Sequence, residues 1–260
     1  MDYNWDKVAG RLLDESVNKL WRRHSDLVNS ELLEAWLYPE KEQRILKTDL
    51  FDEAVSDGLL PIMEERAQYV FGMDISDKIL LKVKSSHPVI RSVKADARHL
   101  PFLTDTFDLV VSNSTLDHFV SGRELIAALC ELRRVLRPGG RLILTLDNMA
   151  NPVIALRRLL PFRFLRRLGI LPYYVGITYT PWRLRRVLDR IGMDAVEITA
   201  IMHFPRIIVV ALGKLVDDRA GRCLNNFLFN AIMAFENLSK LPSRYFTGYF
   251  VAARSKKKSS

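Results

Sequence analysis

Two short apolar runs that each end in an aspartate constrain the fold of this chain most. The first run is Tyr69-Val70-Phe71-Gly72-Met73-Asp74, and the second is Ser92-Val93-Lys94-Ala95-Asp96. Helical patterns separate these runs from each other and from the apolar runs that follow. Strands that alternate with helices form βαβ units and a mostly parallel sheet. Because the carboxyl ends of parallel strands face the ligand crevice, Asp74 and Asp96 are expected to line one site, where a carboxylate can accept both hydroxyls of a ribose.

Hydrophobic periodicity predicts the elements of a complete α/β unit with additions at both ends. Residues 3–37 read as two helices, and further helices are predicted near 58–67, 77–85, 122–136 and 181–191. Strands are predicted at about 43–48, 69–73, 90–95, 107–112, 141–146, 194–201 and 248–254. The expected organisation is an N-terminal helical cap (1–40), a cofactor-binding core (41–148), a basic amphipathic insertion (149–180), a helix and sixth strand (181–203), a helical insertion (204–243), a last strand (244–254) and a disordered tail (255–260).

Residues 41–148, with the terminal strand near 248–254, resemble the class I S-adenosylmethionine-dependent methyltransferases, particularly the type 11-like small-molecule branch. The resemblance implies an α/β fold: a Rossmann-like seven-stranded sheet with an antiparallel last strand, helices on both faces and helical insertions. It also implies S-adenosylmethionine as the cofactor. Asp74 would bind the ribose hydroxyls, and the remaining cofactor contacts would come from Ile75, Asp96, Ala97 and Asn113. Taken singly, either acid could instead cap a neighbouring helix.

The loop after the first strand departs from the family pattern. Lys47 occupies the position of an acidic residue, and Asp49, Phe51 and Glu53 stand where the family has glycines. Carboxylates here would repel the pyrophosphate of a dinucleotide, whereas the sulfonium and ammonium groups of S-adenosylmethionine tolerate them. This argues against NAD and predicts that Asp49 contacts the amino group of the methyl donor.

On the acceptor side, His118 follows the fourth strand at a position that faces substrate in the resembled family. A base with a pKa near neutrality could take a proton from an attacking hydroxyl or amine, although a structural role for His118 is an equal alternative. Simple packing is likewise an alternative for some of the residues expected to contact the acceptor, which are Asp147, Asn148, Tyr174 and His203. The pattern contains no metal site.

The positive charge lies in the C-terminal part of the chain. The net charge is +9, and residues 151–260 hold 19 Lys and Arg against 6 Asp and Glu. Two basic amphipathic pieces, 154–160 and 162–168, are separated by Pro161, which cannot sit inside a helix. Arginines interleaved with Leu and Phe fit an element that lies on an anionic membrane surface. Solvated helix faces are the plain alternative, and nucleic acid is the less favoured partner.

The predicted function is methyl transfer from S-adenosylmethionine to oxygen or nitrogen of a small, hydrophobic or lipid-like acceptor. The alternatives are a non-catalytic methyltransferase-like binding protein and an RNA methyltransferase. No stretch reaches the roughly 18 uncharged apolar residues of a spanning helix, so we expect a cytoplasmic protein, with attachment at the inner membrane surface left open. Cys130 and Cys223 are expected to be buried free thiols in a reducing compartment. The sequence sets no oligomeric state.

Overall fold

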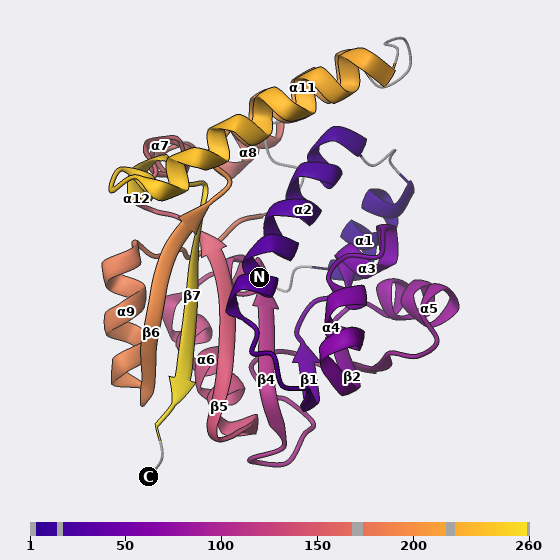
Figure 1. The fold of residues 1–260 in the computed structure, drawn as a ribbon, viewed down its shortest axis with the longest axis vertical. Helices are drawn as coiled ribbons and strands as arrows, with labels where there is room; N and C mark the ends of the chain where they lie inside the picture. The colour runs from indigo at the N-terminus through magenta and orange to yellow at the C-terminus, as the bar shows by residue number, and fades with distance from the viewer. Residues whose placement is uncertain (1–3, 15–17, 168–173, 217–221, 259–260) are drawn as a thin grey trace.

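The computed structural model describes residues 4–14, 18–167, 174–216 and 222–258, and these form a seven-stranded sheet with helices around it (Figure 1). The strands are β1 (Glu42–Lys47), β2 (Ala67–Asp74), β3 (Arg91–Lys94), β4 (Phe107–Asn113), β5 (Leu136–Asp147), β6 (Met193–Ile201) and β7 (Phe250–Lys257). Their order in the sheet is β3-β2-β1-β4-β5-β7-β6, and only β7 runs antiparallel to its neighbours. The predicted Rossmann-like methyltransferase sheet is therefore confirmed.

Helices cover both faces of the sheet, as the alternating pattern predicted. On one face α6 (Gly122–Val135) and α9 (Pro181–Arg190) bury their leucines against β4, β5 and β7. A capping box at Ser121 and Glu124 begins α6. The opposite face is covered by α2 (Lys19–Trp36), α4 (Leu60–Arg66) and α5 (Asp77–Ser86), which form a second apolar cluster with β1 and β2. The short helix α3 (Phe51–Val55), which the sequence did not predict, follows β1 directly.

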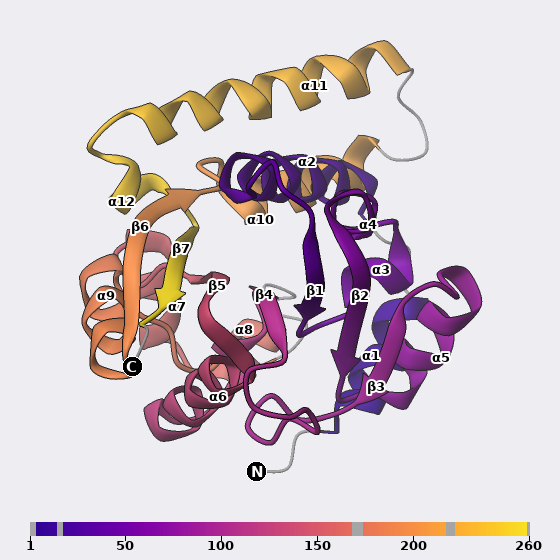
Figure 2. The same ribbon diagram turned by 60° about the horizontal axis from the view of Figure 1, so that its bottom comes forward.

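The remaining helices gather near the carboxyl ends of the parallel strands (Figures 1 and 2). The first insertion contains α7 (Pro152–Leu159) and α8 (Phe162–Arg167), which end and begin on either side of Pro161 as predicted. The second contains α10 (Arg206–Val216), α11 (Arg222–Ala234), the 3₁₀ turn η2 (Phe235–Lys240) and α12 (Arg244–Thr247). Both α10 and α11 contact α2, so the N-terminal cap and the second insertion form one layer.

Several expectations about the ends and the cysteines are corrected. The tail predicted to be disordered from residue 255 continues as β7 to Lys257, whose Nζ donates to the Asp105 carboxylate and the Leu136 carbonyl, both at 2.6 Å. A lysine can join a strand when its ammonium finds such acceptors, which composition alone cannot reveal. Cys130 and Cys223 are free but exposed rather than buried. Among the described residues no helix is long and apolar enough to cross a membrane.

Candidate functional site

The loop between β1 and α3 is organised by a buried ion pair. Lys47 Nζ lies 2.8 Å from Glu53 Oε2, with both side chains almost completely buried, and it also donates to the Asp49 carbonyl. Glu53 Oε1 in turn accepts from the Leu59 amide at 3.1 Å. Lys47 and Glu53, two of the residues in which this loop departs from the family pattern, therefore form an ion pair inside the fold. Leu50 fills the space that Gly72 leaves open, since a Cβ at Gly72 would lie 2.7 Å from Leu50 Cδ2.

Asp74 ends β2 directly beside this loop. Its Oδ2 accepts from the Leu50 amide at 3.1 Å and its Oδ1 from the Ser76 amide at 2.8 Å, and the residue is only 7% exposed. Burial and the neighbouring charge of Asp49 raise the pKa of Asp74 from 3.8 to about 7. Each carboxylate oxygen has a further lone pair, so Asp74 can still accept hydrogen bonds from a ligand.

Negative charge exceeds positive charge around the first loop. Burial raises the pKa of Asp49, whose Oδ1 accepts from the Phe51 amide at 2.9 Å. Burial also opposes ionisation of Asp52, but the guanidinium of Arg22 at 2.5 Å outweighs it and lowers the pKa of that carboxyl. Lys47 pairs with Glu53 and Arg22 with Asp52, and among the described residues no cation forms an ion pair with Asp49 or Asp74. A cationic ligand at this position would relieve their mutual repulsion.

Asp96 and its neighbours lie on the next strand ends. The guanidinium of Arg98 forms a bidentate pair with the Asp96 carboxylate, in which Nε donates to Oδ1 at 3.0 Å and Nη2 donates to Oδ2 at 2.6 Å. Burial raises the pKa of Asp96, but the hydrogen bonds from Arg98 lower it below its ordinary value on balance. Ala97 is buried, whereas Ile75 is 40% exposed and offers an apolar surface beside Asp74. Asp96 would therefore bind a ligand while remaining paired with Arg98.

Asn113 ends β4 and connects the sheet to the loop below α2. Its Nδ2 donates to Asp52 Oδ2 at 3.4 Å, and its Oδ1 accepts from the Thr145 hydroxyl at 2.5 Å. Asn113 and Thr145 also line a small cavity of about 10 Å³ under α2. The structure thus places Asn113 next to Asp52, which follows the first loop.

The N-terminal helix α1 (Trp5–Asp14) spans two of these strand ends. Asp6 Oδ1 accepts from the Ser76 hydroxyl at 2.7 Å at the start of α5, and the Trp5 ring lies 4.9 Å from the ring of His118. One turn of helix therefore joins the end of β2 to the loop after β4. Sequence reasoning missed both residues, because nothing in the pattern of 3–14 indicates which strand ends they reach.

His118 closes a 3₁₀ turn (Leu116–His118) between the donor side and the insertions. Its Nδ1 lies 3.3 Å from the Tyr174 carbonyl, which can only accept, so Nδ1 donates this hydrogen bond. Nε2 lies 3.9 Å from Oδ1 of the buried Asp117, an atom that has no hydrogen-bond partner among the described residues. Burial raises the pKa of Asp117. The arrangement gives His118 the tautomer that a general base needs.

Asp147 and Asn148 end β5, and the fold uses both side chains. Asp147 is buried and forms an ion pair with Arg157 of α7. Asn148 is completely buried, with Nδ2 donating to the Tyr245 and Gly248 carbonyls at 2.8 and 2.9 Å. Asp147 would therefore act on an acceptor only through Arg157. The side chain of Asn148 holds the segment before β7.

A cavity of about 210 Å³ lies over the end of β5, between α7, α8 and the segment 174–178. Its polar lining includes Arg157, Arg158 and Tyr174, and its apolar lining includes Leu160, Phe162 and Leu165. Arg158 Nη1 donates to the Gly176 carbonyl at 2.5 Å, which holds the guanidinium at the cavity wall. Because the Tyr174 carbonyl bonds to His118, the cavity and the predicted base share one wall.

His203 lies apart from this cavity. Its ring nitrogens lie 2.8 Å from the Thr247 hydroxyl and 3.1 Å from the Ala200 carbonyl, and burial lowers the pKa of His203. None of these partners lines the cavity. The structure therefore brings together Asp49, Asp74, Asn113, His118 and Tyr174 along one edge of the sheet and leaves His203 outside.

These residues fit S-adenosylmethionine. The pair of half-buried Asp49 and buried Asp74 suits a ligand that carries a sulfonium and an ammonium, and Asp74 keeps lone pairs for ribose hydroxyls. The exposed Ile75 can pack on an aromatic base. In the part of the chain that the structure describes, no group of His, Cys, Asp and Glu could hold a metal ion.

Comparison with known proteins agrees with this geometry. The profile of a family described as "Methyltransferase domain" matches residues 56–144. The demethylmenaquinone methyltransferase of Streptomyces avermitilis is 38% identical over 76 residues, which cover 29% of this chain and 32% of that protein. A second demethylmenaquinone methyltransferase, from Paenarthrobacter aurescens, is 35% identical over 38% of this chain and 37% of that protein. The chain spans about a third of the length of the curated relatives it matches.

Solved structures share the whole fold. A methyltransferase from Thermotoga maritima, titled S-adenosylmethionine-dependent and a possible histamine N-methyltransferase, has a TM-score of 0.62 at 15% identity over 97% of this chain and 99% of that chain. The cyclase SpnF has a TM-score of 0.63 at 16% identity over 98% of this chain and 92% of that chain. At these identities the likeness shows the fold, which one of these neighbours uses as a cyclase.

Proposed function

We propose that this chain, which has the class I methyltransferase fold and a matching methyltransferase domain, transfers a methyl group from S-adenosylmethionine to oxygen or nitrogen of a small, hydrophobic acceptor. The observation that carries the proposal is the acidic pair of half-buried Asp49 and buried Asp74 at the carboxyl ends of β1 and β2. S-adenosylmethionine, when bound, supplies the methyl group on a positively charged sulfur. The residues of the chain bind the donor, align the acceptor and accept a proton.

On the donor side, Asp74 would accept the ribose hydroxyls and Asp49 would face the donor's ammonium. Ile75 would pack on the adenine, and Asp96, held by Arg98, would meet the adenine amino group together with the Ala97 amide. The α1 residues that reach Ser76 and His118 would cover the bound donor and exclude water. Methyl transfer depends mainly on alignment of nucleophile, methyl carbon and sulfur, so this positioning would provide most of the catalysis.

On the acceptor side, the cavity over β5 suits a compact polar head with an apolar body. The apolar wall of Leu160, Phe162 and Leu165 would contact the body. Arg157 is neutralised by Asp147, but Arg158 keeps donors beyond its bond to Gly176 and would attract an electron-rich oxygen of the head group. A volume of about 210 Å³ holds a head group rather than a whole lipid. Two partial relatives named demethylmenaquinone methyltransferases agree with a hydrophobic acceptor.

His118 would act as the general base. Its Nδ1 donates to the Tyr174 carbonyl beside the cavity, so Nε2 would be the ring nitrogen that takes the proton of an attacking hydroxyl or amine. The neighbouring carboxyl of Asp117 would stabilise the imidazolium that forms. This proton transfer would take place on the side of Tyr174 that faces the donor site, opposite the cavity.

The donor site is tested by calorimetry with S-adenosylhomocysteine. Asp74→Asn removes one acceptor oxygen and the charge, and hydrogen bonds to charged groups are each worth roughly 1.5–3 kcal/mol. We expect the affinity to fall at least about tenfold. The matched control is Asp77→Asn, three residues further along the chain, where the carboxylate is exposed and pairs with Lys94. Equal affinities for the wild type and Asp74→Asn would refute the assignment.

A further inference from the structure

The helices of the first insertion expose large apolar side chains. Leu156 and Leu159 of α7 are 61% and 80% exposed, and Phe164 of α8 is 50% exposed. In an ordinary surface helix these positions would be polar, because one apolar stripe is enough to pack against the core. Here Ile154 and Leu165 already provide the buried contacts of the two helices.

The second insertion repeats this feature on α11. Phe229 and Ile232 are buried in a cluster with Leu20 of α2 and Val209 of α10. On the other side of the helix Leu224 and Phe227 are 46% and 67% exposed, and they continue at helical spacing to Ala231 and Phe235. The polar residues of α11 after Arg222 and Cys223 are only three asparagines. Helix α11 is therefore apolar on its buried side and along a stripe on its exposed side.

The exposed apolar side chains accompany positive charge and no negative charge. Neither α7, α8, α10 nor α11 contains an Asp or Glu. Lysine and arginine occur twice in α7, three times in α8, twice in α10 and once in α11, and of these Arg157 of α7 is paired with the buried Asp147 of β5. Solvent-exposed helices of a soluble protein normally mix both signs of charge, so this one-sided composition indicates an anionic partner.

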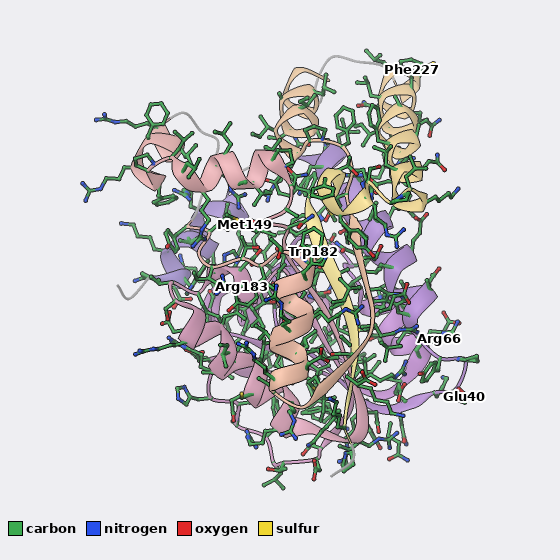
Figure 3. All side chains as sticks on the ribbon, turned by 90° about the vertical axis from the view of Figure 1, so that its left-hand side faces the viewer. Glu40, Arg66, Met149, Trp182, Arg183 and Phe227 are labelled. Carbon is green, nitrogen blue, oxygen red and sulfur yellow. The ribbon has the colours of Figure 1, made fainter. Side chains whose placement is uncertain are left out.

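All four helices lie at the same end of the molecule. Figure 1 shows α7, α8 and α11 beyond the carboxyl ends of the parallel strands, and Figure 2 shows α10 beside α2 beneath α11. In Figure 3 the labelled Phe227 stands at the same end of the molecule as the helices of the first insertion, which lie on the opposite side of the view. The exposed apolar side chains of both insertions therefore belong to helices at one end of the protein.

We propose that α7, α8, α10 and α11 together form a docking surface for an anionic lipid bilayer, named here the insertion face. Leucine and phenylalanine side chains would enter the boundary between head groups and acyl chains, while the arginines would meet lipid phosphates. A bilayer fits better than a protein partner because it offers dense negative charge and an apolar interior over the whole surface at once. The proposal goes beyond methyl transfer and does not depend on the donor site.

Sedimentation with lipid vesicles tests the insertion face. The wild-type protein should sediment with vesicles that contain phosphatidylglycerol, bind weakly to pure phosphatidylcholine, and dissociate as salt screens the arginines. Leu159→Asp in α7 and Phe227→Asp in α11 each place a charge where an apolar group should enter the bilayer. Each should lower the partition coefficient at least about tenfold. Leu103→Asp is the control, because Leu103 is 82% exposed but lies in the loop before β4, away from the insertions.

Three results would overturn the proposal. Failure of the wild type to bind phosphatidylglycerol vesicles at low salt would exclude a bilayer as the partner. Loss of binding in Leu159→Asp but not in Phe227→Asp would remove α11 from the surface. Dissociation of a wild-type dimer by Phe227→Asp, without vesicle binding, would assign the face to a second copy of the chain. Unchanged affinity for S-adenosylhomocysteine in each variant shows that the fold is intact and keeps this test separate from that of the donor site.

Discussion

The acidic pair Asp49 and Asp74 makes the free energy of unfolding depend on pH, over the same pH range in which the proposed donor site changes its charge. The pKa of Asp74 is raised from 3.8 to about 7, first by burial and then by the charge of Asp49. This rise in the pKa of Asp74 corresponds to a free energy of roughly 4 kcal/mol by which the folded state favours the protonated over the charged carboxyl. Because the folded pKa lies above the unfolded pKa, the folded state holds its proton more tightly. The free energy of unfolding should therefore fall as the pH rises from about 4 to about 7.

The perturbation that isolates this effect is Asp49→Asn. Asparagine keeps an oxygen that can accept from the Phe51 amide, which donates to Asp49 Oδ1 at 2.9 Å, but it removes the charge beside Asp74. Burial is the larger cause of the shift, so only part of it should disappear. We expect the pKa of Asp74 to fall by on the order of one unit, and the variant to gain roughly 1 kcal/mol over the wild type at alkaline pH.

Urea denaturation from about pH 4 to alkaline pH measures the free energy of unfolding of Asp49→Asn and of the wild type. The NMR resonance of the Asp74 carboxyl carbon reports the pKa of Asp74 directly. Asp57→Asn, which changes an exposed aspartate after α3, is the matched control. Because a bound cation favours the charged carboxylates, donor binding just below the pKa of Asp74 should release protons. Calorimetry in buffers of different ionisation enthalpy detects that release. A wild-type stability that does not change between acid and alkaline pH, or an Asp49→Asn variant without any gain, would refute the reasoning.

Two further variants probe the loop and the base. Lys47→Met leaves Glu53 buried without its cation and should lower the free energy of unfolding by roughly 3–5 kcal/mol in thermal or urea unfolding. The double variant Lys47→Met with Glu53→Leu should recover most of that loss. A Lys47→Met variant as stable as the wild type would contradict the buried pair. His118→Ala should leave the affinity for S-adenosylhomocysteine within about twofold but lower transfer of labelled methyl groups to a lipid extract about 10²-fold or more. Unchanged transfer would make His118 a structural residue.

The sheet could be predicted because its information is local. Strands such as β4 and β5 contain an apolar run of suitable length, and the alternation of strands with helices allows few topologies. The register that places Asp74 and Asn113 at one edge follows from that alternation. The same reasoning correctly separated α7 from α8 at Pro161, since proline acts on its own segment of chain.

The closing contacts could not be predicted because they join residues far apart in sequence. His24 of α2 is completely buried and lies 2.9 Å from Glu236, which is 212 positions further along the chain. The ring contact of Trp5 with His118 and the ion pair of Arg157 with Asp147 are of the same kind. Hydrophobic periodicity shows which face of a helix is buried but not which partner it meets.

The first loop contains no glycine, and its backbone conformation does not require one. Among the described non-glycine residues, positive φ occurs at Asp105, Ser114 and Met202, none of which lies in this loop. The chain turns directly into α3, so side chains at 49, 51 and 53 cause no strain. Glycine is instead needed at two places that receive the loop's side chains. Gly58 has a φ of +54° and leaves room for the Glu53 carboxylate, and Gly72 leaves room for Leu50. Glycine is therefore found behind the first loop rather than in it, so in the proposed donor site carboxylates such as Asp49 would face the donor.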